Sequence, residues 1–182
     1  MSNREEGSSQ IYVARSSDDV VVVRVVGRGT FDLSPRLTTV MEAFNTKKTS
    51  PRYIIDLAEC TTLDSTFMGV IASLAVHQNY CGMDHTIVVN PRSVTHRQIE
   101  TMGLQYLLDL RTKPPVEVAT ITGEGFERVE PTVQSRVEQL VHMIESHEAL
   151  IDAHSGNEIL FRPVLKSLQE SLERAKENEA SE

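Results

Sequence analysis

A run of β-branched residues constrains the fold of this chain more than any other feature. Residues 20–26 read Val-Val-Val-Val-Arg-Val-Val, and β-branched side chains fit the pleated surface of a sheet well. Asp18 and Asp19 come directly before this run and favour a turn. The segment Ile11–Arg15 before the turn is also extended in pattern, so the sequence predicts a β-hairpin at 11–26.

Helical and extended segments alternate after this hairpin. Ser34 followed by Pro35 indicates a helix start, with Ser34 as the N-cap and Pro35 in the first helical position. Strands that alternate with helices predict an α/β fold, in which a mixed sheet packs against helices. The expected elements are a helix at 34–44, a polar loop at 45–50, a strand at 53–57, a loop at 58–63, a helix from 65 to about 81 closed by Gly82, a strand at 86–89, a helix at 93–102 closed by Gly103, a segment at 104–110 that mixes helical turn and strand, and a last strand at 116–121.

The last third of the chain has a different pattern, in which apolar residues recur alternately four and three positions apart. Each of two such sets forms one apolar stripe on a helix. Residues 155–157 separate the two helices, and Pro163 places the start of the second helix just before it. The stripes are Val133, Val137, Leu140, Ile144, His147 and Ile151 in the first helix, and Phe161, Leu165, Leu168, Leu172 and Ala175 in the second.

These patterns divide the chain into a disordered N-terminus at 1–9, an α/β domain at 10–122, a linker at 123–130 and a C-terminal helical hairpin at 131–178. The apolar stripes of the hairpin need a surface, because two isolated helices bury too little apolar area to be stable alone. Two alternatives remain open for that surface. The hairpin folds back over a face of the α/β domain, or it forms a homodimer or docks a partner.

Charge and hydropathy exclude several classes of function. Residues 1–122 carry 12 Lys and Arg against 13 Asp and Glu, whereas 123–182 carry 6 against 13. An acidic tail on a near-neutral domain argues against nucleic-acid binding. No apolar run approaches the roughly 20 residues of a membrane span, and the polar start of the chain lacks the apolar core of a signal peptide, so we expect a cytoplasmic protein. Cys60 and Cys81 are expected to be reduced thiols.

The segment around Ser65 carries the candidate site. A strand ending in Asp56-Leu57 is followed by a loop and then by Asp64-Ser65-Thr66, which opens a helix. These residue types are common N-caps, so a purely structural role accounts for them. A serine at a helix N-terminus also lies where the helix dipole favours negative charge. A phosphate there would add about 1.5–2 negative charges to a docking surface without unfolding the domain.

This pattern resembles the STAS family, named for sulfate transporters and anti-sigma-factor antagonists. In that family a strand ending in Asp-Leu precedes a motif of the form Asp-Ser-Ser/Thr-Gly-Leu-Gly, and here 64–69 read Asp-Ser-Thr-Phe-Met-Gly. The order of strands and helices, Gly27 after the second strand, and the small-residue turn at Met102-Gly103 are also similar. The resemblance covers about 11–121 and leaves the hairpin outside.

The resemblance implies a bacterial anti-sigma-factor antagonist that works by partner switching in transcription regulation. Ser65 would accept a phosphate from a partner that is both serine kinase and anti-sigma factor, and a serine phosphatase would reset it. Thr66 would be a secondary acceptor. The partner-binding surface implied by the resemblance comprises Thr30, Asp32, Asp64, Ser65, Thr66, Phe67 and Met68. Phe67 replaces the family's first glycine, and Gly27-Arg28-Gly29-Thr30 replaces its Gly-Glu-Leu-Asp, which affects the partner more than the fold.

Other functions find less support in the sequence. Phe67, which departs from the motif, and the long hairpin favour an alternative, a STAS scaffold subunit in an oligomeric stress-signalling complex. A hydrolase would need a base near Ser65, and His77 lies about three turns along the same helix. His142 and His147 are five positions apart, which is not the spacing of a helical metal site. We therefore expect no enzyme activity, no metal and no cofactor.

Overall fold

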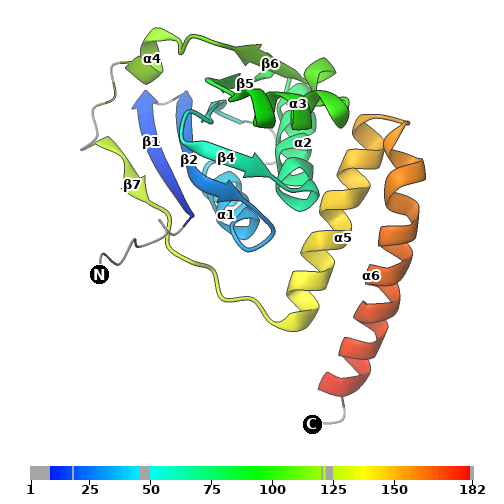
Figure 1. The fold of residues 1–182 in the computed structure, drawn as a ribbon. Coiled ribbons are helices and arrows are strands. Elements are labelled where there is room, and N and C mark those ends of the chain that lie inside the picture. The colour runs from blue at the N-terminus through cyan, green and yellow to red at the C-terminus, as the bar shows by residue number, and fades with distance from the viewer. Residues whose placement is uncertain (1–8, 18, 46–49, 120, 122–124, 181–182) are drawn as a thin grey trace, which may run out of the picture.

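The computed structural model describes residues 9–17, 19–45, 50–119, 121 and 125–180. Among these, seven strands form one mixed sheet in the order β6-β5-β3-β2-β1-β7, with β4 paired to the far end of β2 (Figure 1). The strands are β1 Gln10–Ser17, β2 Val20–Gly29, β3 Arg52–Asp56, β4 Cys60–Leu63, β5 Thr86–Val89, β6 Leu108–Arg111 and β7 Glu127–Arg128; the helices are α1 Ser34–Phe44, α2 Ser65–Tyr80, α3 Ser93–Thr101, the short η1 Leu104–Tyr106, α4 Val116–Ala119, α5 Arg136–Ala153 and α6 Asn157–Glu179.

The valine-rich strand β2 lies inside the sheet. It pairs antiparallel with β1 and parallel with β3, and Val20–Val23 are all buried. Successive side chains of a strand point to opposite faces. Val21 and Val23 therefore join the larger core cluster beneath α1 and α2, whereas Val20 and Val22 join a smaller cluster with Val118 of α4. The predicted hairpin, the α/β class and the mixed sheet are confirmed.

Three predictions about where strands lie are wrong. The segment predicted as a last strand at 116–121 contains α4, because β6 already occupies the edge beside β5, and Val118 turns inward to cover the second face of the sheet. The loop predicted at 58–63 contains β4, which pairs with β2 where Gly27 adopts a positive φ and the register shifts. The predicted linker at 123–130 contains β7, which pairs with β1.

Two helix starts also differ from the prediction. Helix α1 begins at Ser34 itself, and its N-cap is Leu33. The Ser34 hydroxyl donates to the carbonyl oxygen of Phe31 at 3.0 Å instead of capping the helix. Helix α6 begins at Asn157, so Pro163 lies inside it, where the proline ring leaves the carbonyl oxygen of Ile159 without its helical donor.

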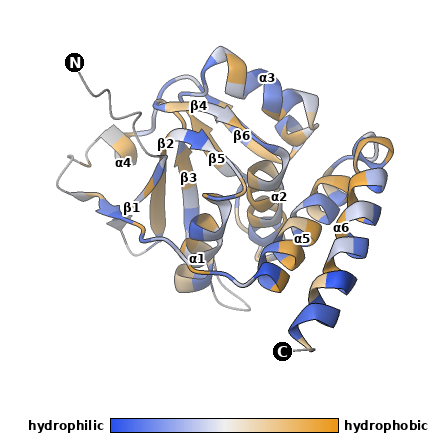
Figure 2. Ribbon diagram, turned by 60° about the horizontal axis from the view of Figure 1, so that its bottom comes forward, coloured by the Kyte–Doolittle hydropathy of each residue, from blue (hydrophilic) through white to orange (hydrophobic). Residues whose placement is uncertain are grey.

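The C-terminal hairpin is present and folds back onto the rest of the chain. Helix α5 lies between α2 and α6, so that α6 is the outermost helix (Figure 1). Leu150 and Phe161 of the hairpin belong to the larger core cluster. Towards its C-terminus α6 is mostly hydrophilic (Figure 2). Most of the predicted disordered segment (1–8), the last residue of the predicted α/β domain (122) and part of the predicted linker (123–124) lie outside the described residues.

Candidate functional site

Asp64 fixes the geometry of the candidate site. It is the N-cap of α2, and its Oδ1 accepts a hydrogen bond from the backbone N–H of Phe67 at 2.8 Å. Its Oδ2 accepts from the backbone N–H of Phe31 at 2.7 Å, and its own N–H donates to the carbonyl oxygen of Gly29. The bond to Phe67 is the one that the N-cap interpretation predicted. The bond to Phe31 is additional, and through it one carboxylate joins the start of α2 to the loop that follows β2.

Ser65 is the first residue of α2 and is partly exposed. Its Oγ lies 3.0 Å from Nε2 of His147, which comes from α5. Nδ1 of His147 lies 2.6 Å from the carbonyl oxygen of Met143, and a carbonyl oxygen can only accept. In the neutral ring Nδ1 therefore carries the proton, and Nε2 accepts from the Ser65 hydroxyl.

The Ser65–His147 pair was missed by the sequence analysis, because it joins positions 82 residues apart. The only signal was the place of His147 in the apolar stripe of the first hairpin helix, because residues of such a stripe are usually buried. In the structure the His147 side chain is 3% exposed and meets the Phe161 ring edge-on, with ring centroids 5.0 Å apart.

The predicted partner surface divides into two groups. Thr30, Asp32, Asp64 and Ser65 are accessible at the edge formed by the loop after β2 and the start of α2. The other three residues are buried, with Thr66 at 3%, Phe67 at 0% and Met68 at 4% exposure. In this conformation the accessible part of the site is therefore the loop at 30–32 together with Asp64 and Ser65.

A groove with a cavity volume of about 520 Å³ opens beside Ser65. Met68 of α2, Met102 after α3, and Leu160 and Phe161 of α6 line it. The exposed residue Arg97 of α3 lines the same groove. Ser65 thus lies between the accessible loop on one side and a mainly apolar groove, lined in part by the hairpin, on the other.

A second serine–histidine pair lies between the start of α1 and α5. Oγ of Ser34, at the start of α1, is 2.7 Å from Nε2 of His142 on α5. Because the Ser34 hydroxyl donates to Phe31, the His142 Nε2–H donates to Ser34. Burial lowers the pKa of His142 below its ordinary value of 6.5, since the charged ring is less well solvated there.

This pKa shift predicts a pH-dependent stability. Well above pH 6.5 His142 is neutral in both the folded and the unfolded state, so folding carries no protonation cost. As the pH falls through 6.5, the unfolded chain binds a proton that the folded chain does not, and the free energy of unfolding decreases until the pH reaches the lower folded-state pKa. Denaturant titrations between pH 7.5 and roughly pH 5 should show this slope in the wild type.

The matched variants are His142→Gln and His85→Gln. A glutamine at 142 retains an N–H donor for Ser34 but cannot titrate in this range, so its slope should be smaller than that of the wild type. His85 is exposed, so His85→Gln should leave the slope unchanged. An unchanged slope in His142→Gln would contradict the assignment.

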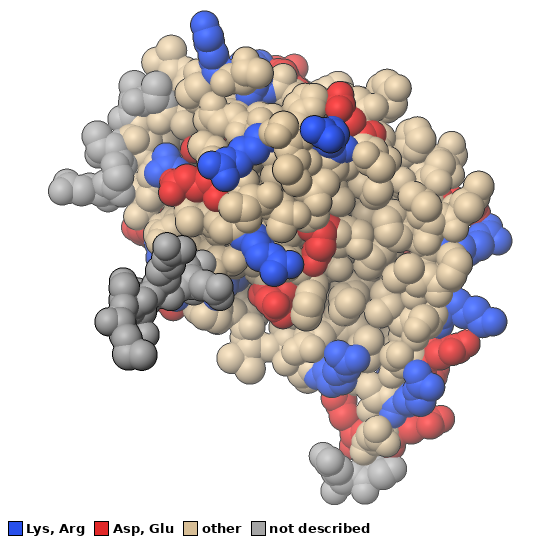
Figure 3. Space-filling view, viewed as in Figure 1, with Lys and Arg blue, Asp and Glu red and all other residues tan. Residues whose placement is uncertain are grey.

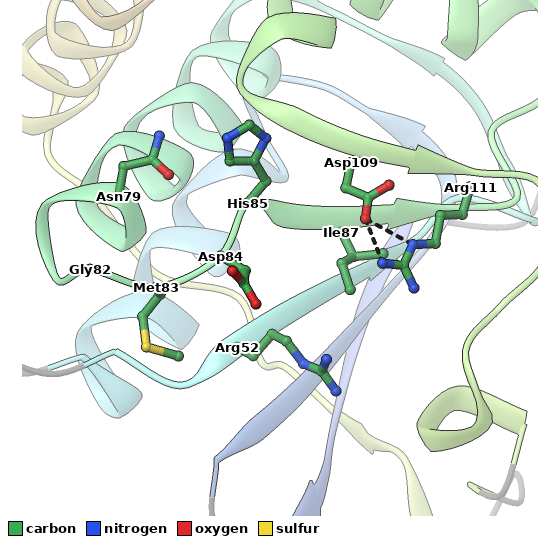
Figure 4. Close-up of a pocket in the computed structure, with 9 residues that line it drawn as sticks. All are labelled: Arg52, Asn79, Gly82, Met83, Asp84, His85, Ile87, Asp109 and Arg111. Atoms are coloured by element: carbon green, nitrogen blue, oxygen red, sulfur yellow. Dashed lines mark hydrogen bonds and ion pairs between the residues drawn. The ribbon is translucent and has the colours of Figure 1, made fainter.

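A separate cavity of about 580 Å³ lies at the other end of α2 from Ser65 (Figure 4). It is lined by the ends of β3, β5 and β6 and by the turn after α2. Charged groups of both signs project towards it, including Arg52, Asp84 and the ion pair between Asp109 and Arg111 (Figure 4). The mixed charge distinguishes this cavity from the mainly apolar groove beside Ser65.

The described residues contain no group of three or more His, Cys, Asp and Glu that could hold a metal ion. Within the same ranges, no helix is both long and apolar enough to cross a membrane. On the face shown in Figure 3, basic and acidic side chains are interspersed, including those near the C-terminal end of α6.

The fold that carries this site is STAS-like. It is a mixed sheet packed with helices, in which α1 and α2 both begin beside the loop that follows β2. A solved structure from Thermotoga maritima, described as "a putative anti-sigma factor antagonist", matches with a TM-score of 0.52 and 17% sequence identity. The match covers 59% of this chain and 91% of that one. No family model matches the sequence, and no curated protein matches it.

Proposed function

We propose that this protein is a phosphorylation-switched interaction module of the anti-sigma-factor antagonist kind, acting in the bacterial cytoplasm. Its partner would be an anti-sigma factor that is also a serine kinase, and a serine phosphatase would reverse the modification. The observation that carries the proposal is the place of Ser65, which is partly exposed at the first position of α2 beside the accessible loop at 30–32. The likeness in fold supports it.

The electrostatics of the site support a switch at Ser65. Asp64 occupies the N-terminus of α2 with one carboxylate oxygen, and the helix dipole favours further negative charge at this end. A phosphate on Ser65 is therefore compatible with the helix. A partner that docks on residues 30–32 and 64–65 would meet about 1.5–2 additional negative charges beside Asp32 and Asp64, which weakens binding through repulsion and desolvation.

The first test is phosphosite mass spectrometry on protein from its native cells, with and without stress. Cleavage before aspartate releases residues 64–83, a peptide that carries Ser65 near its end. We expect phosphate on Ser65 that changes with the condition and is absent in Ser65→Ala. Full coverage of this peptide without phosphate under every condition would contradict the proposal.

The second test concerns binding. Ser65→Glu should weaken capture of the anti-sigma kinase from native cells by tenfold or more, which corresponds to about 1.4 kcal/mol or more. Ser65→Ala should retain it. Ser93→Glu is the matched control, because Ser93 is the exposed first residue of α3 and receives the same charge at a comparable helix position. Equal capture by wild type and Ser65→Glu would overturn the switch.

A scaffold function is the second candidate. Ile159, Leu160 and Val164 on α6 are 84%, 53% and 37% exposed. Apolar side chains that cluster on an outer helix are typical of an association surface, so homodimerisation through the C-terminal helices is the form this function would take. Light scattering at high protein concentration tests it, and a monomer at every concentration would exclude it.

A further inference from the structure

The C-terminal hairpin covers the face of α2 that begins at Ser65. Helix α5 approaches α2 closely at Gly69, where an added Cβ atom would lie 2.1 Å from the carbonyl oxygen of Ser146. Real Cβ atoms essentially never come within 3.0 Å of such an atom. A glycine at 69 is therefore required for the two backbones to meet, and the contact lies one turn beyond Ser65.

Polar contacts hold the hairpin over the same face. Ser65 bonds to His147 and Ser34 bonds to His142, so α5 reaches the first residue of both α1 and α2. These four polar side chains can bond to water instead when the hairpin moves away. Leu140, Ile144 and Leu150 of α5 are buried as well, so both polar and apolar contacts hold the hairpin over this face.

The tip of the hairpin provides a second anchor. The Asn157 side-chain amide donates to the carbonyl oxygen of Met102 at 3.0 Å, and the ring of His154 lies where a Cβ at Gly103 would be, 2.4 Å away. The segment that leads into the other end of α5 has no regular structure at 129–135 and is mostly exposed. The hairpin is thus held at its tip and along α5, and joined to the sheet by an extended tether.

We propose that the hairpin is an intramolecular ligand of the Ser65 face, so that a protein partner reaches Ser65 only when the hairpin moves away. This inference rests on the proposed function for the identity of the competing partner. The contact by which the hairpin covers the Ser65 face is independent of that function. The face it closes accepts a helix at backbone contact distance, because Gly69 and the fully buried Ala72 present almost no side chain. The partner element that replaces α5 should therefore be a helix with a small residue at its centre.

Access to position 65 can be measured in the full-length chain by thiol labelling. The parent variant combines Ser65→Cys with Cys81→Ser, and Cys60 remains because it is fully buried. Two probes are compared, N-ethylmaleimide and a maleimide coupled to a protein-sized polymer. Both react with the same thiolate, so the ratio of their rates reports steric access and cancels the intrinsic reactivity of the thiol.

The wedge variant adds Gly69→Ala, which pushes α5 away without lowering the helix propensity of α2. We expect the polymer probe, relative to the small probe, to react at least tenfold faster than in the parent. Gly82→Ala is the matched control at the other end of α2, where nothing lies within 4 Å of the added Cβ and only local backbone strain results. Its rate ratio should equal that of the parent.

Hydrogen exchange identifies a wedge variant that has simply unfolded. In a valid experiment the amides of α5 lose protection while those of β2 and β3 keep it. Should the sheet also lose protection, His147→Ala replaces the wedge, since it removes one hairpin contact without adding atoms. Equal rate ratios in the parent and in a folded wedge or His147→Ala variant would overturn the proposal that the hairpin blocks access to Ser65. Absence of phosphate on Ser65 would overturn only the proposed function.

Discussion

Phe67→Ala should lower the free energy of unfolding by about 3–5 kcal/mol, the usual cost of truncating a fully buried aromatic side chain. Phe67 is 0% exposed and lies in the larger core cluster. Its ring atoms lie 3.1–3.2 Å from the place where a Cβ at Gly29 would be, so β2 leaves this space for the ring. The phenylalanine that departs from the family motif is thus a core residue in this conformation.

Urea or guanidinium titration with a constant m-value measures this loss. Phe31→Ala is the matched control, because its side chain is 46% exposed and its hydrogen bond to Asp64 uses the backbone N–H. The control should change the free energy of unfolding by less than about 1 kcal/mol. A similarly small effect for Phe67→Ala would show that the ring is not packed in the core. It would then favour the original prediction that Phe67 belongs to the partner-binding surface.

Asp56→Ala should have the second largest effect, a loss of about 2–4 kcal/mol. Asp56 is 4% exposed and ends β3. Its carboxylate accepts from Arg24 at 3.2 Å, from the backbone N–H of Ala58 at 3.1 Å and from Asn90 at 3.1 Å. Truncation leaves three donors without this acceptor, and one of them is a half-buried guanidinium that also stacks on Phe126.

The control for Asp56→Ala is Asp109→Ala. Asp109 also pairs with an arginine, Arg111, but the two side chains are 39% and 43% exposed. Exposed ion pairs contribute little to stability because water screens and solvates them, so this variant should lose less than about 1 kcal/mol. Comparable losses in the two variants would contradict the assignment of Asp56 as a buried anchor between β2, β3 and the loop at Asn90.

Local patterns predicted the elements that carry their own signal. The valines of β2, the N-cap at Asp64 and the two apolar stripes of the hairpin each describe short-range physics, and each element is present. Val133 of the first stripe is the exception, because it lies before α5 and is 95% exposed. The predictions failed at β4, β7 and α4. Short strands at 60–63 and 127–128 form because β2 and β1 offer unpaired edges, and residues 116–119 turn into a helix because the edge beside β5 is filled.

The sequence by itself determined which residues start α2 and which faces of each helix are apolar, because helix caps and periodicity depend on neighbours within a few positions. Only the tertiary structure decided what those faces touch. The approach of Ser146 to Gly69 and of His147 to Ser65 joins residues far apart in the chain. Contacts of this kind depend on how the shapes of two packed helices fit together. The periodicity of either helix alone does not specify that fit. For this reason the candidate phosphorylation site followed from sequence, whereas its cover by the hairpin did not.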